Sequence, residues 1–228
     1  MWATNSDDGI PNGLNMILLD DQNYDMHAHI STSIWDYMKN SLGSEKVYDI
    51  ATFKVVDVAG NERPVQSPLC IMFTPETTVH EVPDINSSIP KMKFNLLQLQ
   101  QIYEDYRHYV EDATFANDII GVLENMQSLI FDNQISGPEP MIKFWIGDGS
   151  KSFIVHLTGE LAASVFNIYQ ADLETSVILV LASMKVQVSE ATGGIIFVNT
   201  PASKVYANPS LSMVYGMRHR LDRDGYVS

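Results

Sequence analysis

Cysteine is nearly absent from this chain of 228 residues, which contains one, Cys70. A single cysteine excludes an internal disulfide and a zinc site built from cysteines. Apolar runs long enough to cross a membrane, about 18 residues, are missing too, and the N-terminus lacks the basic-then-apolar pattern of a secretory signal. We therefore expect a globular protein of a reducing compartment, the nucleus or the cytosol, with no membrane contact.

Signatures of catalysis are also missing. The glycine-rich points are typical of turns and match neither a P-loop nor a dinucleotide fingerprint. His27, His29 and His156 fall in predicted strands, with no serine, cysteine or carboxylate at a motif spacing. His27 and His29 share a strand face, but no third metal ligand is evident. The sequence thus predicts a protein that is not an enzyme and holds no metal, cofactor or small-molecule substrate.

Positive charge is scarce: 14 Lys and Arg stand against 28 Asp and Glu, which gives a net charge of −14. Such a balance argues against nucleic-acid binding, whose electrostatic footprint is basic. The acidity is uneven, however, because residues 1–84 carry 4 basic and 13 acidic side chains and residues 85–140 carry 3 and 8. Residues 141–228 carry 7 of each, so this last third is neutral and is compatible with a local basic surface.

One pattern of elements occurs twice along the chain. Each half reads as a set of strands around one helix, an order like that of an OB-fold barrel. A linker from Pro83 to Pro90 and a helical period over Leu96–Val110 separate the halves. The first half is predicted to have strands at Leu14–Leu19, Met26–Ile30, Val47–Val58, Leu69–Phe73 and Thr77–Val82, with a helix over Ser31–Leu42. The second is predicted to have strands at Ala116–Met126, Met141–Ile146, Ser152–Thr158 and Val177–Val188, with a helix over Gly159–Tyr169.

Short motifs add a family resemblance. Leu157-Thr158-Gly159-Glu160-Leu161 precedes the Gly193-Gly194 hairpin and a strand that ends in Ala207-Asn208-Pro209-Ser210-Leu211. In order and spacing, the chain resembles the large (70 kDa) DNA-binding subunit of replication protein A, in its plant-type relatives, over the first two DNA-binding OB domains. The resemblance implies a mainly β fold, with tandem five-stranded Greek-key barrels joined by a linker helix. It places the domains at 1–84 and 113–228, with the linker and helix at 85–112.

Several positions depart from that family's pattern. The first barrel of the family opens with a basic strand ending in Trp, and Met1-Trp2 match only its end, so we expect a truncated opening strand and an open edge. The resemblance assigns base-stacking aromatics to Thr158 and to Thr192 or its neighbour in the second domain. In the first domain it assigns them to Ile30 and to a position near Arg63. None of these residues is aromatic.

The resemblance also implies candidate DNA-binding residues. Lys54 falls where the family has a phosphate-contacting lysine, and Lys185 lies within two or three residues of the corresponding arginine. Trp145 and Phe197 are interpreted as core residues, with a place in the DNA-binding groove as the alternative. The full candidate set is Lys54, Arg63, Lys143, Lys151, Thr158, Lys185 and Thr192.

Two functions remain open from the sequence. The first is a nuclear single-stranded DNA-binding protein in replication, recombination and repair, with weak DNA binding and with other replication or repair proteins as further partners. The second is a degenerate OB-fold paralogue that acts as a protein-interaction module with weak or no DNA binding. The acidity and the missing aromatics favour the second, and the family resemblance favours the first.

Overall fold

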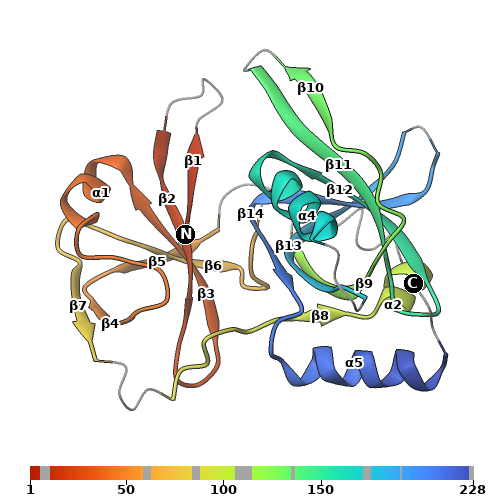
Figure 1. Cartoon of the computed structure of the whole chain (residues 1–228). Helices are drawn as coiled ribbons and strands as arrows, with labels where there is room; N and C mark the ends of the chain where they lie inside the picture. The colour runs from red at the N-terminus through yellow and green to blue at the C-terminus, as the bar shows by residue number, and fades with distance from the viewer. Residues whose placement is uncertain are drawn as a thin grey trace. The chain divides into compact units, whose positions relative to one another are not determined.

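The computed structural model describes residues 1–5, 11–58, 63–83, 88–105, 115–134, 137–171, 176–190 and 192–225. The chain divides into two compact units, Met1–Lys93 and Phe94–Ser228. Both are built mainly of β-strands (Figure 1). The mainly β, tandem OB-fold architecture expected from the sequence is confirmed.

The first unit pairs its strands in two groups. One sheet has the order β1-β2-β3-β6-β5, and a separate pair joins β4 to β7. The β3–β6 pairing is parallel and the others are antiparallel. The strands are β1 (Trp2–Asn5), β2 (Pro11–Leu19), β3 (Asp25–Ser31), β4 (Val47–Ala51), β5 (Lys54–Asp57), β6 (Leu69–Met72) and β7 (Thr78–Val82), and helix α1 (Thr32–Met38) follows β3.

The second unit closes its sheet into a ring. Strands pair in the order β11-β12-β14-β13-β9, and β9 pairs again with β11, which completes a barrel. The barrel strands are β9 (Asn117–Glu124), β11 (Gly137–Gly147), β12 (Ser152–Thr158), β13 (Ile178–Val188) and β14 (Ile195–Ala207). Around them lie β8 (Leu96–Leu97), α2 (Leu99–Glu104), β10 (Ile130–Gln134), α4 (Gly159–Gln170) and α5 (Ser212–Arg223).

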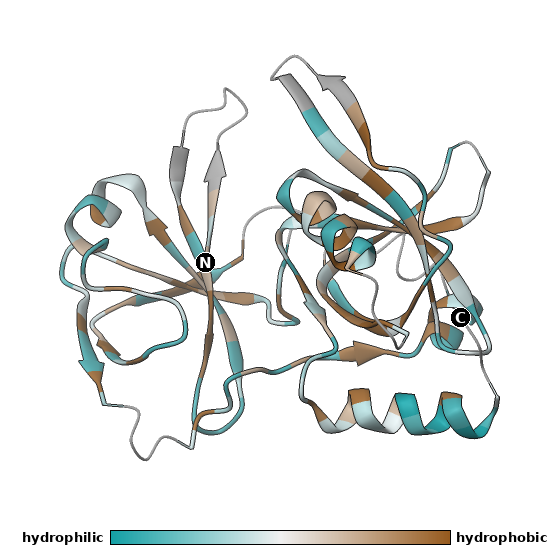
Figure 2. Ribbon diagram, in the orientation of Figure 1, coloured by the Kyte–Doolittle hydropathy of each residue, from teal (hydrophilic) through white to brown (hydrophobic). Residues whose placement is uncertain are grey.

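Alternation along the strands builds the core of this second barrel. Phe144, Val155 and Phe197 point inward and are fully buried, because successive side chains of a strand lie on opposite faces. α2 adds Leu99 and Ile102 to the same core. Hydrophobic and hydrophilic residues both occur along α5 (Figure 2). This helix covers part of the barrel's outside, where Val214, Met217 and Leu221 pack on Val122, Ile178 and Val180.

The two units share a topology, but the first has no counterpart of β9 among its described strands. In the second unit β9 joins β13 to β11, whereas β4 pairs only with β7 in the described part of the first. The inner face of β5 is uncovered as a result. Val55 is 53% exposed, while Val186, at the same register position of the second barrel, is 1% exposed.

The expected helix between the domains is shorter in the described part of the chain. α2 spans Leu99–Glu104 and packs within the second unit, and residues 106–112 lie outside the described ranges. The domain limits at 84 and 113 therefore stay a prediction. Within the described residues, no helix has the length and apolar character needed to span a membrane.

Candidate nucleic-acid interface

One part of the second barrel's outer face is not covered by α5. Its side chains alternate with the core residues of β11, β12, β14 and β13, and they line up across the sheet because the strands are in register. Lys143 lies opposite His156, His156 opposite Val198, and Val198 opposite Lys185. We call these four residues, Lys143, His156, Val198 and Lys185, the lysine row.

A second row runs beside it, two residues further along each strand. Trp145 lies opposite Ile154, Ile154 opposite Ile196, and Ile196 opposite Gln187. We call Trp145, Ile154, Ile196 and Gln187 the tryptophan row. At its β9 end it continues to Glu124, the register partner of Trp145, whose carboxylate accepts a hydrogen bond from the Ser152 hydroxyl at 2.8 Å.

On the other side of the lysine row, Thr158 lies opposite Met141, and Met141 opposite Ile130. Ile130 is 48% exposed, so this edge of the face is largely aliphatic. At its Lys143 end, the lysine row is therefore flanked by apolar side chains, Met141 on one side and Trp145 on the other. Cations beside apolar surface suit a ligand that is charged along one edge and flat and apolar along another.

The first unit repeats the lysine row at equivalent positions. Asn15 lies opposite His29, His29 opposite Met72, and Met72 opposite Lys54. His29 and His156 both stand two residues before the last residue of the strand that leads into a helix. Lys54 and Lys185 thus occupy the same place in the two barrels, each two strands away from a histidine.

The same turn in the strand precedes each of these lysines. Thr52 has a φ of 61° and Ser183 a φ of 55°, and each stands two residues before its lysine. Two hydroxyls hold each turn. Ser203 and Thr200 donate to the Ser183 carbonyl at 2.7 and 3.0 Å.

In the first unit the two hydroxyls belong to Thr77 and Thr74, which donate to the Thr52 carbonyl at 2.9 and 3.3 Å. A backbone bond closes each arrangement. The Thr200 N–H donates to the Ser203 hydroxyl and the Thr74 N–H to the Thr77 hydroxyl, both at 2.8 Å. We call this arrangement the hydroxyl clamp. It places both lysines on the outer face.

Titration behaviour along the rows follows from burial. Burial lowers the pKa of His156, and the nearby Lys143 ammonium lowers it further. Burial also lowers the pKa of His29. His27 is affected most, with a pKa lowered to about 4, first by burial and then by His29. At neutral pH these three histidines are therefore uncharged.

On the outer face of the first unit, side chains of the row contact one another. The side-chain oxygen of Asn15, Oδ1, accepts hydrogen bonds from His27 Nε2 at 2.9 Å and from His29 Nδ1 at 3.0 Å. Trp2 stacks on His27 with ring centroids 5.7 Å apart. Position 15 corresponds to Lys143 of the second barrel and position 17 to Trp145. The row of the first unit therefore contains one lysine, whereas the lysine row of the second unit contains two. Ile17 stands in the place of Trp145.

The predicted DNA-binding residues are brought together only in part. Lys143 and Lys185 share the lysine row, and Lys54 has the equivalent place in the first unit. Lys151 lies in the β11–β12 hairpin, with its ammonium 3.9 Å from the centre of the Tyr103 ring. Arg63 is half-buried in the segment before β6.

The positions at which the resemblance implies base-stacking aromatics differ from one another. Thr158 is half-buried, and its backbone N–H donates to Asn199 Oδ1 at 2.9 Å. Thr192 is exposed in the β13–β14 hairpin, where its hydroxyl accepts from the Gly194 N–H at 3.2 Å. Ile30 is fully buried in the core of the first unit. The stacking position expected at Ile30 is therefore wrong, and Ser31, at the same place as Thr158 before the helix, is its counterpart.

Of the two aromatics interpreted as core residues, Phe197 is fully buried and packs in the core. Trp145 is half-buried and belongs to the outer face, in the alternation opposite to Phe144. The core interpretation is thus confirmed for Phe197 and wrong for Trp145. The alternation of Lys143 and Trp145 with Ile142 and Phe144 is the sequence signal that separates these two faces.

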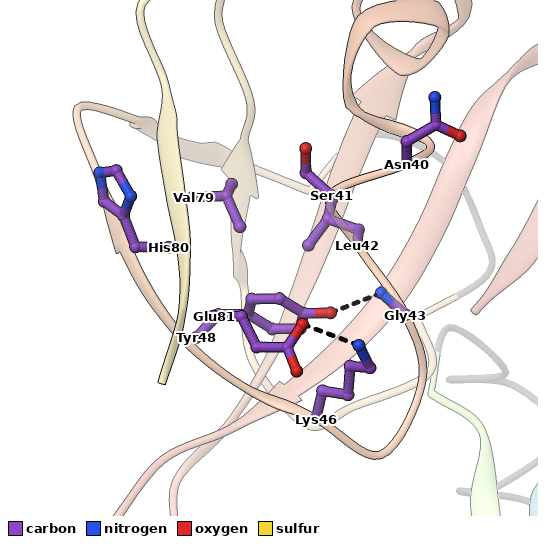
Figure 3. A pocket seen from close by; sticks show the side chains of 9 residues that line it. All are labelled: Asn40, Ser41, Leu42, Gly43, Lys46, Tyr48, Val79, His80 and Glu81. Atoms are coloured by element: carbon purple, nitrogen blue, oxygen red, sulfur yellow. Dashed lines mark hydrogen bonds and ion pairs between the residues drawn. The ribbon is translucent and has the colours of Figure 1, made fainter. Parts of the chain in front are cut away.

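Two pockets among the described residues contain none of the predicted DNA-binding residues. One, of about 380 Å³, is lined by residues of β8, α2 and α5. The other, of about 340 Å³, lies between the end of α1 and the β4–β7 pair (Figure 3). There Lys46 pairs with Glu81 at 2.7 Å and the Tyr48 hydroxyl accepts from the Gly43 N–H at 2.7 Å. No group of three His, Cys, Asp or Glu within the described ranges is placed to hold a metal ion.

Comparisons with known proteins agree with this architecture. Residues 3–105 match the family model described as domain of unknown function DUF223. A structure of a replication protein A heterotrimer bound to ssDNA is similar at 20% identity and a TM-score of 0.60, over 99% of this chain and 50% of that chain. This chain therefore spans half the length of that relative. The likeness shows an OB-fold architecture similar to that of replication protein A.

Two further structures are less similar. The second OB-fold domain of replication protein A from Methanococcus maripaludis matches at 13% identity and a TM-score of 0.31, over 42% of this chain and 88% of that chain. The Ifi202 HINa domain in complex with 20bp dsDNA matches at 15% identity and a TM-score of 0.43, over 91% and 90%. No curated protein matches the sequence.

Proposed function

We propose that this protein binds single-stranded DNA on the outer face of each of its two OB barrels. The observation that carries the proposal is the duplicated row, in which Lys54 and Lys185 hold the same register position, each preceded by the same hydroxyl clamp. A lysine fixed at one place in two barrels suits a ligand with repeating negative charge. A single strand with its regularly spaced phosphates is such a ligand.

The similarity to the ssDNA-bound replication protein A heterotrimer supports a role of the same kind. Within this proposal the protein is a plant-type relative of the replication protein A large subunit, acting in the nucleus in DNA replication, recombination and repair. It carries out no catalysis and binds other replication or repair proteins as further partners.

Binding is expected to be weak. The net charge of −14 repels phosphate at long range, and aromatics at the two stacking positions that the resemblance implies in the second barrel would contribute roughly 1–3 kcal/mol per base. We expect a dissociation constant in the micromolar range or weaker at physiological salt, with a steep salt dependence.

Fluorescence anisotropy of a labelled oligo-dT, about 20–30 nucleotides long so that it spans more than one OB site, tests the proposal at two salt concentrations. Micromolar binding that weakens with salt supports it. Binding that is absent even at low salt contradicts it, and a protein-interaction module then becomes the better account. A duplex of the same length shows whether the unpaired strand is what the protein prefers.

A further inference from the structure

We infer that Trp145 is the base-stacking platform of the second barrel, with phosphates held along the lysine row and a base on the tryptophan row. This inference rests on the proposed function and deepens it. It assigns a stacking role to a residue that stands away from both stacking positions that the resemblance implies in this barrel, Thr158 and Thr192. The platform would lie on the opposite side of the lysine row from Thr158.

The strand register places Trp145 on the outer face. Its neighbours along β11, Phe144 and Ile146, are fully buried in the core, so the tryptophan must point the other way. It is half-buried and does not belong to either apolar cluster of the second unit. A large aromatic side chain on an outer sheet face, beside lysines, has the surface that a base stacks on.

Its surroundings divide the face by chemistry. Ile154 continues the tryptophan row as a half-buried apolar side chain, which suits the face of a base, and Ile196 beyond it is buried. Glu124, at the β9 end of the row, repels phosphate. Cations occupy the neighbouring row instead, at Lys143 and Lys185.

The spacing of the rows also fits a nucleotide. Residues two apart on a strand are separated by roughly 7 Å along it, from a rise of 3.2–3.4 Å per residue. A phosphate over Lys143 and a base over Trp145 would therefore lie roughly 7 Å apart. The single strand would cross β11, β12, β14 and β13, and its backbone would follow the lysine row.

The first barrel provides an internal comparison. Ile17 has the place of Trp145 there and is 41% exposed, and His27, opposite it, is engaged by Trp2 and Asn15. The position equivalent to Trp145 is thus aliphatic in the first barrel. The aromatic on that face, Trp2, lies instead opposite Asn15, where its ring is stacked on His27.

The test uses the full-length chain with Trp2→Phe and Trp35→Phe, which leaves Trp145 as the single tryptophan. Titration with oligo-dT is followed in parallel by Trp145 emission and by the anisotropy of the labelled oligonucleotide. We expect the emission to be quenched, with the same half-saturation as the anisotropy. Anisotropy that reports binding while the emission stays constant would overturn the inference and leave the proposed function intact.

Substitution gives a second measurement. Trp145→Ala should weaken binding by about 5- to 150-fold, the equivalent of 1–3 kcal/mol per stacked base, and Trp145→Phe should restore most of the loss. The salt slope should be unchanged because no phosphate contact is removed. Tyr215→Ala, which removes an exposed aromatic of α5 outside the rows, is the control and should leave the affinity unchanged.

A folded Trp145→Ala protein with wild-type affinity would contradict the inference. If this variant does not fold, the emission titration still decides. Anisotropy that detects no binding by the unsubstituted chain would remove the proposed function and the inference together.

Discussion

The uncovered inner face of the first barrel gives a direct prediction for stability. Val55 and Val186 stand at the same register position, opposite Ile71 and Phe197, but are 53% and 1% exposed. Truncating each to alanine removes the same atoms from two different environments. The comparison therefore isolates the contribution of burial.

At Val186, alanine removes two methyl groups from a packed core. Transfer contributes about 0.8 kcal/mol per group, and the cavity left behind adds about 1 kcal/mol, for a total loss of about 2–3 kcal/mol. The Val55 side chain is about half exposed, so its burial contributes only about half of the free energy of transfer, and its truncation leaves no closed cavity. The expected loss of stability is about 0.5–1 kcal/mol.

Urea denaturation followed by tryptophan emission measures both losses. Trp145 reports on the second unit, and Trp2 and Trp35 report on the first, so tryptophan-to-phenylalanine backgrounds separate the two transitions. With a slope of about 2 kcal/mol per M urea, Val186→Ala should lower its unit's midpoint by about 1 M or more, and Val55→Ala its own by under about 0.5 M. Equal losses at the two sites would refute the reasoning that the first barrel's inner face is open.

Other predictions concern the hydroxyl clamp and the half-buried side chain of His27. Ser203→Ala should cost about 1–3 kcal/mol, measured by the same denaturation, because it leaves the buried Thr200 N–H without its acceptor; Ser203→Thr should retain stability, and an alanine variant that loses nothing would contradict the clamp. Thr77→Ala should behave likewise in the first unit. The pKa of His27 is about 4 in the folded protein and its ordinary value is 6.5, so the unfolded chain takes up the proton first and stability should fall as pH drops from about 6.5 towards 4, by about 1–2 kcal/mol after allowance for partial exposure. His27→Gln should flatten thermal midpoints across that window, and an undiminished slope would count against this assignment.

Much of the fold was predictable from local patterns. The strand Ser152–Thr158 has the predicted bounds, and α4 ends one residue beyond the predicted Tyr169. The alternation of apolar residues and the Gly147-Asp148-Gly149 and Gly193-Gly194 turns act over a few residues, so the sequence displays them directly. The strand β10 and the break between β4 and β5 depend on pairing and on the turn at Thr52, which the sequence does not display.

The candidate site was predicted less completely, because rows across a sheet join residues that are far apart in sequence. The sequence places Lys185 only to within two or three residues, since the register shift at Ser183 offsets any count along the strand. The pairing fixes it opposite Val198. In the sequence, His29 and His156 are histidines without catalytic partners at a motif spacing. Their shared place in the two rows depends on the parallel pairing of β3 with β6 and of β12 with β14.

The central claim, that Lys54 and Lys185 hold phosphates at equivalent places, is tested most directly by the salt dependence of oligo-dT binding. Lys54→Ala and Lys185→Ala should each lower the slope of log K against log salt by about 0.7–1, and the double variant by about twice that. Lys39→Ala and Lys204→Ala, exposed lysines outside the rows, should leave the slope unchanged. Slopes for the Lys54 and Lys185 variants that equal those of these controls would contradict the account.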